Sequence, residues 1–505
     1  MNSIHSINIF DFIAFLLYDL ESYATTKAAG LESLSYDPAD SYKEYVAEFI
    51  NKIKTAYNYQ KMDYFHYIVN EGIPAEIYKE YLNNYNFRIN KDAVFYLVNS
   101  IVINLLNSDS ILKAAHSASR KARFINKTVG FKQLNSDKSV EETKYIILPD
   151  LGTFGDENKI NRTTTNFEKI YLKGLIILTI SDLCTRKGES YEIRNILPEE
   201  ASHYSRYPLD GKLVIAVSPI SDRWLLKDQP KIIANNYGTK EYLFECDGIT
   251  DEEFIKSRIV SAYRESCSQG AHILLFPEMF GTEDLSNHAD DVIKNHAGSD
   301  APLIVMPSWW HDNMNTASVV DDALVTVYKQ SKFNPFLYSP HSPKYQHNSR
   351  EYLQNTERII YIYHLPGIGR ICICICKDFL MDSYRRMLSE SLEASIILIP
   401  AFSPKIEHFT NCMDELKHAG SYGVFVNCCA ARCSADSEQP SISKHDTVGA
   451  ISITRALSDE SDPPLRLLHP TCNGNCGGDK TCCVFIIKIT TDGTVSIEHV
   501  HKDYS

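Results

Sequence analysis

The chain has 505 residues, a hydrophobic fraction of 44%, a charged fraction of 23% and a formal net charge of -13 at pH 7. This length predicts two to four domains of roughly 150 residues each, and the acidic balance argues against a dedicated nucleic-acid binder. The apolar runs IFDFIAFLLYDL and IYLKGLIILTI are too short or too charged to cross a bilayer, so we expect a cytoplasmic protein without a membrane anchor.

The first part of the chain has mainly helical spacing of its apolar residues. Residues 40–59 and 91–107 are the clearest examples. Residues 131–165 are polar and predict long loops around the apolar piece YIILP, and 166–184 predicts one further helix. The polar run TRKGESYEIRNILPEEASHYSRYPLDG is typical of a linker. We therefore predict a mostly α-helical N-terminal domain over residues 1–208.

From residue 212 the pattern changes to alternating strands and helices. Thr250 and Glu253 have capping-box spacing and Gly270 is a natural helix stop, so a helix is predicted between them. The predicted strands are KLVIAVSPI, HILLF, PLIVMPSWW, ASVVD, ALVTVYKQSK, RIIYIYHL, RICICIC, SIILIP and GVFVNCC. This composition predicts an α+β domain over residues 209–505, with a packed pair of sheets flanked by helices.

Three cysteines alternate with isoleucines in the run GRICICICKDF. On a strand Cys372, Cys374 and Cys376 share one face, about 6.6 Å apart, which suits neither a disulfide nor two bonds to one zinc ion. The pattern becomes helical soon after Asp378, so the last thiol stands at the carboxyl end of a strand, where α/β folds place their chemistry. In a reducing compartment such thiols are core residues, metal ligands or nucleophiles.

Two other predicted strands also end in charged residues. Glu278 follows ILLF, while Lys329 and Lys332 lie in VYKQSKFNPF. Glutamate, lysine and cysteine in this order resemble the nitrilase, or carbon-nitrogen hydrolase, superfamily, whose motifs look like FPE, Y-x-K with a Pro-aromatic pair, and G-x-x-x-C-x-D. The run NTASVVD and the segment after Cys376 are similar as well. The resemblance covers about residues 212–455 and implies an α-β-β-α sandwich.

The resemblance implies a role for each of these residues. Cys376 would be the nucleophile, Glu278 the general base and a lysine the cation that stabilises the oxyanion, with the backbone N–H of Lys377 as the second donor. The chemistry would be hydrolysis of an amide-type bond through a thioester, without a metal or cofactor. By the same resemblance we expect a homo-oligomer and a small-molecule substrate.

Two site positions stay open on the sequence alone. On a strand Lys329 and Lys332 point to opposite faces, so only one can enter the site; Lys332, at the strand end, is favoured over Lys329. The family often has a second glutamate between its lysine and cysteine. Glu351 and Glu357 are the candidates for that position.

A second cysteine cluster lies in HPTCNGNCGGDKTCC. Close ligand spacing in a glycine-rich loop is typical of a structural zinc site, and the alternative is a loop whose thiols bind no metal. The candidate ligands are His469, Cys472, Cys476, Cys482 and Cys483, with Cys428, Cys429 or Cys433 as possible additions.

Two rival functions have to be set beside the hydrolase. The order Cys376, His418, Asn427 is that of papain-like proteases, although nothing else around Cys376 resembles them. The other rival is a catalytically weak or inactive nitrilase-fold assembly or sensor module. It would bind a protein partner through the helical domain, in bacterial antiviral defence by analogy with defence proteins that carry nitrilase-like domains.

Overall fold

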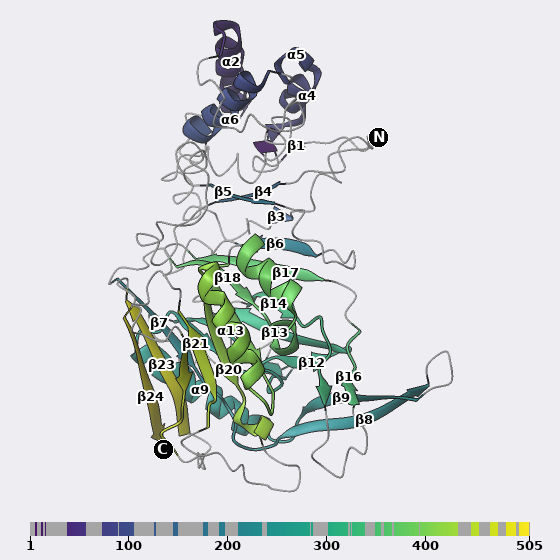
Figure 1. The fold of residues 1–505 in the computed structure, drawn as a ribbon, viewed down its shortest axis with the longest axis vertical. Coiled ribbons are helices and arrows are strands. Elements are labelled where there is room, and N and C mark those ends of the chain that lie inside the picture. The colour runs from purple at the N-terminus through teal and green to yellow at the C-terminus, as the bar shows by residue number, and fades with distance from the viewer. Residues whose placement is uncertain are drawn as a thin grey trace. The chain divides into compact units, whose positions relative to one another are not determined.

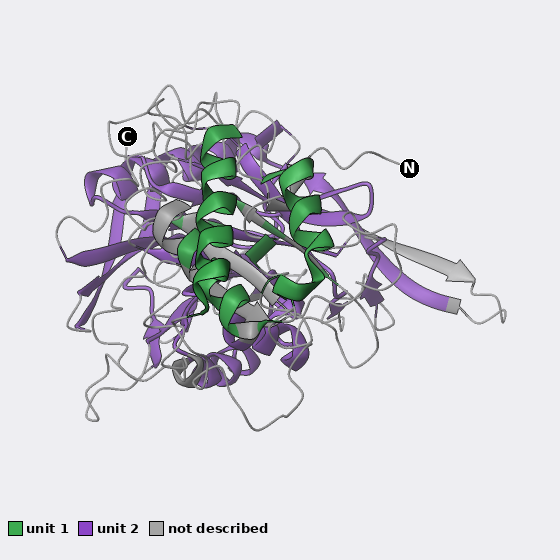
Figure 2. Cartoon of the chain, turned by 90° about the horizontal axis from the view of Figure 1, so that it is seen from above, with its two compact units in different colours: residues 1–201, 363–367 green, residues 202–362, 368–505 purple. Residues whose placement is uncertain are grey.

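The computed structural model describes residues 38–56 and 73–105, short pieces elsewhere before residue 197, and most of 211–503, with its main gaps at 235–239, 286–300, 339–348, 433–445, 454–464, 473–480 and 491–493. The chain forms two compact units, one of residues 1–201 with 363–367 and one of 202–362 with 368–505 (Figure 2). It is a mixed protein of helices and several sheets (Figure 1).

Helices form in the first unit where the apolar spacing predicts them. They are α2 (Asp40–Ala56), α4 (Ala75–Asn83), α5 (Tyr85–Arg88) and α6 (Lys91–Leu105). Buried aromatic rings hold them together: the ring of Phe12 lies 5.8 Å from Phe49 and 5.3 Å from Tyr81, centroid to centroid. Such pairs add about 0.5–1.5 kcal/mol each beyond the area that they bury.

Three strands of the first unit differ from the sequence prediction. Strand β4 (Tyr145–Pro149) pairs antiparallel with β5 (Leu175–Thr179), so a helix across 166–184 is wrong for those five residues. Strand β6 (Glu192–Ile196) lies inside the predicted linker. Short apolar runs such as LIILT have no periodicity long enough to separate helix from strand, and the pairing partner decides.

One sheet of the second unit supplies the first half of the site. Its strands are β7 (Lys212–Val217), β10 (Ile273–Leu275), β11 (Leu303–Val305), β12 (Trp309–His311), β13 (Met314–Val320), β14 (Thr326–Ser331), β23 (Thr481–Thr490) and β24 (Val495–Asp503). The spatial order is β12-β13-β11-β10-β7-β23-β24, with β14 also pairing with β13. Because β7, β10 and β11 are parallel, their carboxyl ends lie at one edge.

A second sheet supplies the other half. Within the second unit it contains β18 (Gly369–Ile373), β19 (Ile396–Ala401), β20 (Tyr422–Asn427), β21 (Gly449–Ser452) and β22 (Leu465–Leu468), adjacent in this order. Strands β18, β19 and β20 are parallel. A smaller sheet contains β8 (Leu226–Ala234), β9 (Lys240–Ile249), β15 (Leu337–Tyr338) and β16 (Ser349–Glu351).

Helices cover the two larger sheets. Helix α9 (Glu252–Ser268) packs on β23, and α13 (Glu407–Ala419) packs on β20 and β21 (Figure 1). Every residue of β19 and β20 is buried, so both faces of that sheet are covered. Continuous apolar strands of this kind require cover on both faces. None of the helices in the described part of the chain combines the length and apolar character needed to cross a bilayer.

Helix α9 forms as predicted but is capped differently. The N-cap is Asp251, whose carboxylate accepts a hydrogen bond from the N–H of Phe254 at 3.0 Å. Thr250 instead donates its hydroxyl to the carbonyl of Leu225. Asp251 is as good an N-cap as threonine, and its position one residue later fits the first turn. Gly270, with φ +63°, follows the helix end as expected.

Candidate active site

Three residues at strand ends meet in the interior of the second unit. Glu278 follows β10, Lys332 follows β14 and Cys376 follows β18, so two different sheets contribute. Their exposed fractions are 1%, 1% and 0%. The ends of these three strands thus bring a carboxylate, an ammonium and a thiol into one buried region.

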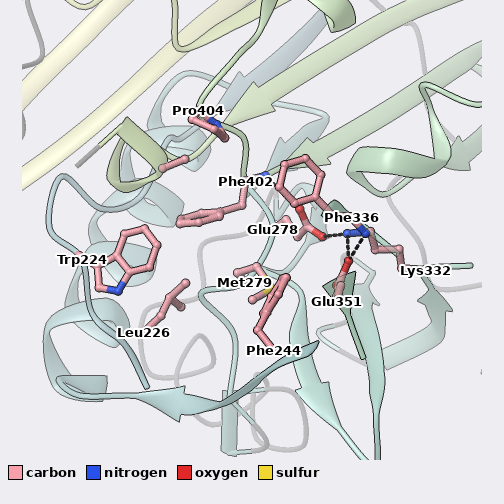
Figure 3. Close-up of a pocket in the computed structure, with 11 residues that line it drawn as sticks. Trp224, Leu226, Phe244, Glu278, Met279, Lys332, Phe336, Glu351, Phe402 and Pro404 are labelled. Carbon is pink, nitrogen blue, oxygen red and sulfur yellow. Dashed lines mark hydrogen bonds and ion pairs between the residues drawn. The ribbon is translucent and has the colours of Figure 1, made fainter. Parts of the chain in front are cut away.

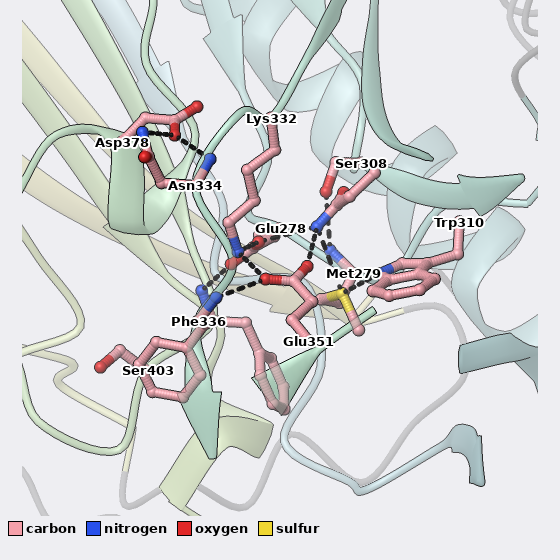
Figure 4. A network of polar contacts seen from close by, with 12 residues as sticks. Glu278, Met279, Ser308, Trp310, Lys332, Asn334, Phe336, Glu351, Asp378 and Ser403 are labelled. Atoms are coloured by element: carbon pink, nitrogen blue, oxygen red, sulfur yellow. Dashed lines mark hydrogen bonds and ion pairs between the residues drawn. The ribbon is translucent and has the colours of Figure 1, made fainter. Parts of the chain in front are cut away.

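The ammonium of Lys332 lies between two carboxylates (Figure 4). Its Nζ is 2.7 Å from Oε1 of Glu278 and 2.6 Å from Oε2 of Glu351. Buried charges persist when they are paired and hydrogen-bonded, and this cluster meets both conditions. With one cation and two carboxylates, it carries one net negative charge when all three groups are ionised.

Neutral N–H donors hold the two carboxylates in place. Asn315, on β13, donates from Nδ2 to Glu278 at 2.8 Å and to Glu351 at 3.1 Å. The backbone N–H of Phe336 donates to Glu351 at 2.9 Å, and that of Phe402 donates to Glu278 at 3.0 Å. Each carboxylate therefore has donors besides the lysine, and its orientation is fixed before any ligand arrives.

The thiol of Cys376 lies beside the same carboxylate. The charge of Glu278 raises the pKa of this thiol. Cys376 opens a short 3-10 turn (Cys376–Asp378) with φ +46°, and Met279, next to Glu278, has φ +79°. Non-glycine residues in this region cost about 1–3 kcal/mol each and concentrate at functional sites.

Burial and mutual charge determine the protonation of the cluster. Burial raises the pKa of Glu278 above its usual range, against the opposing charge of Lys332. Burial alone lowers the pKa of Lys332, but the charges of Glu278 and Glu351 outweigh it and hold that pKa well above the usual range. Burial and the charge of Glu278 raise the pKa of the Cys376 thiol well above its usual range. The resting thiol therefore holds its proton beside a carboxylate able to accept it.

Asp378 connects the cysteine turn to the lysine segment. Its carboxylate accepts hydrogen bonds from the backbone N–H groups of Phe333 and Asn334 at 2.9 and 2.7 Å, and from Nδ2 of Asn334 at 2.8 Å. Burial raises the pKa of Asp378 to about 7, against these three donors. The residue directly after Lys332 is thus tied to the turn that carries Cys376.

A largely apolar cavity opens beside the cluster (Figure 3). It measures about 510 Å³, counting the space open to solvent at its mouth. The lining residues are Trp224, Leu226, Phe244, Glu278, Met279, Lys332, Phe336, Glu351, Phe402, Pro404 and Ala431. Aromatic rings dominate one side: Trp224 and Phe402 meet edge to face with centroids 5.5 Å apart. Cys376 is not among the lining residues.

The structure separates the residues that the sequence left open. Lys329 is exposed and its Nζ lies 5.8 Å from the ring of Trp309, away from the cluster. Glu351 lies in the cluster, whereas Glu357 lies outside the described residues. Lys377 is partly exposed in the turn after Cys376. Of the two open pairs, the geometry brings Lys332 and Glu351 to the site.

The remaining candidates are Asn427 and His418 of the protease alternative and the thiols of Cys372 and Cys374. Asn427 exchanges hydrogen bonds with the backbone of Ser403, and the side chain of His418 lies outside the described residues. Cys372 and Cys374 are fully buried, and burial raises the pKa of Cys372 to about 12. Both are inert core thiols in these surroundings.

The structure brings only two of the predicted metal ligands that it describes close together. Cys472 and Cys483 lie close together with His499, which the sequence reading did not include. Cys482 is buried in the hydrophobic core, and Nδ1 of His469 lies 3.3 Å from the carbonyl oxygen of Asp446. Cys476 and Cys433 lie outside the described residues, while Cys428 and Cys429 are buried.

Two parts of the cluster were not recognised from sequence. Asn315 belongs to the run NTASVVD, but only its position between Glu278 and Glu351 gives it a role. The N–H of Phe402 has no side-chain signal at all. For Asn315 the available sequence signal was a polar residue at the start of the apolar run NTASVVD; in the structure it is fully buried.

Comparison with known proteins gives matches among solved structures. No protein-family model and no curated protein matches the chain. The matching structures include members of the nitrilase superfamily. Nit3 of Saccharomyces cerevisiae, from branch 10 of that superfamily, is 12% identical with a TM-score of 0.33, over 58% of this chain and 91% of its own.

Two further structures illustrate the range of matches. A variant of the amidase from Nesterenkonia sp. AN1 carries the acetamide moiety of fluoroacetamide covalently on its active-site cysteine; it is 13% identical with a TM-score of 0.34, over 58% of this chain and 92% of its own. The C. elegans NitFhit protein is 14% identical with a TM-score of 0.30, over 48% of this chain and 56% of its own.

Proposed function

We propose that the chain hydrolyses an amide-type carbon-nitrogen bond, with Cys376 as nucleophile, Glu278 as general base and Lys332 as oxyanion cation, on a nitrilase-like α-β-β-α sandwich. One observation carries the proposal: a buried thiol lies beside a carboxylate that is itself 2.7 Å from an ammonium, next to an apolar cavity. A nucleophile placed next to a base is the signature of covalent catalysis.

The first half of the proposed reaction forms a thioester. Glu278 takes the thiol proton as the sulfur of Cys376 attacks the amide carbon. The carbonyl oxygen becomes an oxyanion, stabilised by the ammonium of Lys332 and the N–H of Lys377. The tetrahedral intermediate then collapses, the carbon-nitrogen bond breaks, and Glu278 gives its proton to the leaving amine.

The second half repeats the steps with water. Glu278, again a carboxylate, takes a proton from a water molecule that attacks the thioester carbonyl. The carbon-sulfur bond breaks, and the thiolate recovers its proton from Glu278 while the carboxylic acid leaves. Glu351 and Asn315 act as positioning residues, because they contact Lys332 and Glu278 in the resting structure.

The cavity supports a preference for an apolar acyl group. Trp224, Phe244 and Phe402 offer ring faces and edges, and Lys332 is the sole cation among the lining residues of the described cavity. That cation is already paired with Glu278 and Glu351. A carboxylate on the substrate would meet net negative charge without a free cation, so a neutral aromatic or aliphatic amide fits best.

One observation favours the rival reading of an inactive module. Cys376 has no exposed surface and does not line the cavity. A substrate in the described cavity therefore does not touch the thiol. If the thiol stays closed off, the site is a folded but silent scaffold.

Thiol labelling separates the two readings. We would treat the protein with chloroacetamide and follow the intact mass of the wild type, Cys376→Ala, Glu278→Gln and the control Cys412→Ser, whose thiol lies on helix α13. The hydrolase predicts one fast modification that is lost in Cys376→Ala, slowed in Glu278→Gln and retained in Cys412→Ser. Slow labelling that none of the three substitutions changes would support the scaffold, and a screen of neutral amides would then be expected to show no turnover.

A further inference from the structure

A second constellation of reactive side chains lies away from the proposed site. The ligand atoms of Cys472, Cys483 and His499 all lie within 4.8 Å of one another. Cys472 precedes β23, Cys483 is on β23, and His499 is on β24. Three separate stretches of chain therefore converge on one point with two thiols and an imidazole.

The register of the hairpin explains the convergence. In the antiparallel pair β23 and β24, Phe485 lies opposite His499 and Cys483 lies opposite His501. Side chains two apart share a face, so Cys483 and His499 are diagonal neighbours on one face. Cys482 faces the other way, into the hydrophobic core. The pleat thus divides the adjacent cysteines, one for the core and one for this cluster.

The imidazole of His499 is held in orientation from two sides. Its ring stacks on Phe485 with centroids 4.4 Å apart and planes at 20°. Its Nδ1 accepts a hydrogen bond from the backbone N–H of Thr471, the residue before Cys472, at 2.9 Å, and lies 2.6 Å from Oγ1 of the same threonine. Nε2 is then left facing Cys483, at 3.2 Å from Sγ. The stacking and the contacts with Thr471 together fix the ring plane, with Nε2 toward Cys483.

The distances suit a small tetrahedral ion. Bond lengths of about 2.3 Å to sulfur and about 2.0 Å to nitrogen place tetrahedral ligand atoms about 3.5–3.8 Å apart. The separation of 3.2 Å between Cys483 and His499, and the limit of 4.8 Å for all three, lie on either side of this range. Bringing all three atoms into this range changes their separations by at most about 1 Å.

We propose that Cys472, Cys483 and His499 bind one Zn²⁺ ion, with a structural role. Two thiolates and an imidazole are a donor set that selects zinc over the harder magnesium or calcium. Binding releases the two thiol protons to solvent. The imidazole proton moves from Nε2 to Nδ1, so the backbone N–H of Thr471 turns away from Nδ1 and Oγ1 of Thr471 accepts the proton instead. The charges of two thiolates and Zn²⁺ then sum to zero.

The ion would tie the outer hairpin to the chain that enters it. Strand β24 is the last strand of its sheet, and β23 joins it to β7. Outer strands are prone to fray and to pair with other chains. A bond from His499 through zinc to Cys472 and Cys483 would hold β24 in register. This role is independent of amide hydrolysis.

Metal content of the full chain tests the proposal. The protein would be expressed with zinc in the medium, passed through buffer with a weak chelator and analysed by plasma mass spectrometry. We expect about one zinc per chain, retained in Cys376→Ala and Cys412→Ser and lost in the double variant Cys483→Ser/His499→Ala. Cobalt substitution should give the visible absorption of a tetrahedral thiolate site in the wild type, and the double variant should not show it.

The outcomes that overturn the proposal are equally specific. Zinc retained by the double variant, or lost from Cys376→Ala, would place the ion elsewhere. Wild type without zinc, whose mass shows a disulfide between Cys472 and Cys483, would identify a redox pair instead. A strong chelator must also lower the Tm of the wild type, which keeps the test valid if the double variant folds poorly. An unchanged Tm would exclude a structural role.

Discussion

Replacing Lys332 with methionine tests the buried cluster most directly. Methionine keeps much of the side-chain length and removes the ammonium that lies 2.7 Å from Glu278 and 2.6 Å from Glu351. Two carboxylates with exposed fractions of 1% and 2% would remain without their shared cation. Removing one partner of a buried ion pair costs about 3–5 kcal/mol, so we expect the free energy of unfolding to fall by about this amount.

Lys329→Met is the matched control, three residues away on the opposite face. Lys329 is exposed and contacts the ring of Trp309, so its replacement should change stability by no more than about 1 kcal/mol. Urea unfolding followed by tryptophan fluorescence and circular dichroism measures both variants. If Lys332 is the oxyanion cation, its loss should also lower kcat about 100–1000-fold, while Lys329→Met leaves kcat unchanged.

The double variant Lys332→Met/Glu351→Gln tests the electrostatic cause. Neutralising one of the two carboxylates should restore part of the lost stability, so the two costs should not add. The reasoning fails if the double variant loses as much free energy of unfolding as the two single variants lose together. Repulsion between the buried carboxylates would then not be the source of the destabilisation. It also fails if Lys329→Met proves as costly as Lys332→Met.

Three further predictions concern the surroundings of the cluster. Asp378→Asn presents an NH₂ group to N–H donors and should lower the free energy of unfolding by about 1–3 kcal/mol in urea, with little change for Asp414→Asn on the exposed face of α13. Because burial raises the pKa of Asp378 to about 7, its carboxyl binds more protons folded than unfolded; the stability from this group is full below about pH 3.9 and is lost as the pH rises to about 7. Between these pH values the free energy of unfolding should therefore fall more steeply with pH for the wild type than for Asp378→Asn. Equal slopes would contradict the raised pKa of Asp378. Trp224→Ala should lower kcat/KM for phenylacetamide about tenfold relative to acetamide, and an equal loss for both would argue against an aromatic acyl subsite.

The candidate site could be predicted where a charged or reactive side chain follows a predicted strand. The period of two separates Lys329 from Lys332, and the structure places only Lys332 among the carboxylates. Glu351 could not be chosen over Glu357, because it reaches the cluster through a parallel pairing of β16 with β9 that no local pattern reveals. The backbone donor from Phe402 depends on the packing of two sheets and has no sequence signature.

The fold was predictable in the same uneven way. Helix α9 and the buried strands of the second unit have long or strongly apolar patterns, which local physics determines. The strand Leu175–Thr179 and the choice of His499 over His469 depend instead on partners distant in the chain. His499 meets Cys483 only through the register of a hairpin, across 16 positions. Pairing of this kind is a tertiary property.

The Glu278 carboxylate has one oxygen bonded to each half of the domain. Oε1 accepts from Lys332 and Asn315, which belong to the sheet of β13 and β14, while Oε2 accepts from Phe402 after β19 in the other sheet. This arrangement of side chains therefore forms only when both sheets are folded. Loosening either sheet would disrupt the arrangement, so we expect the proposed hydrolysis to be lost at milder stress than secondary structure.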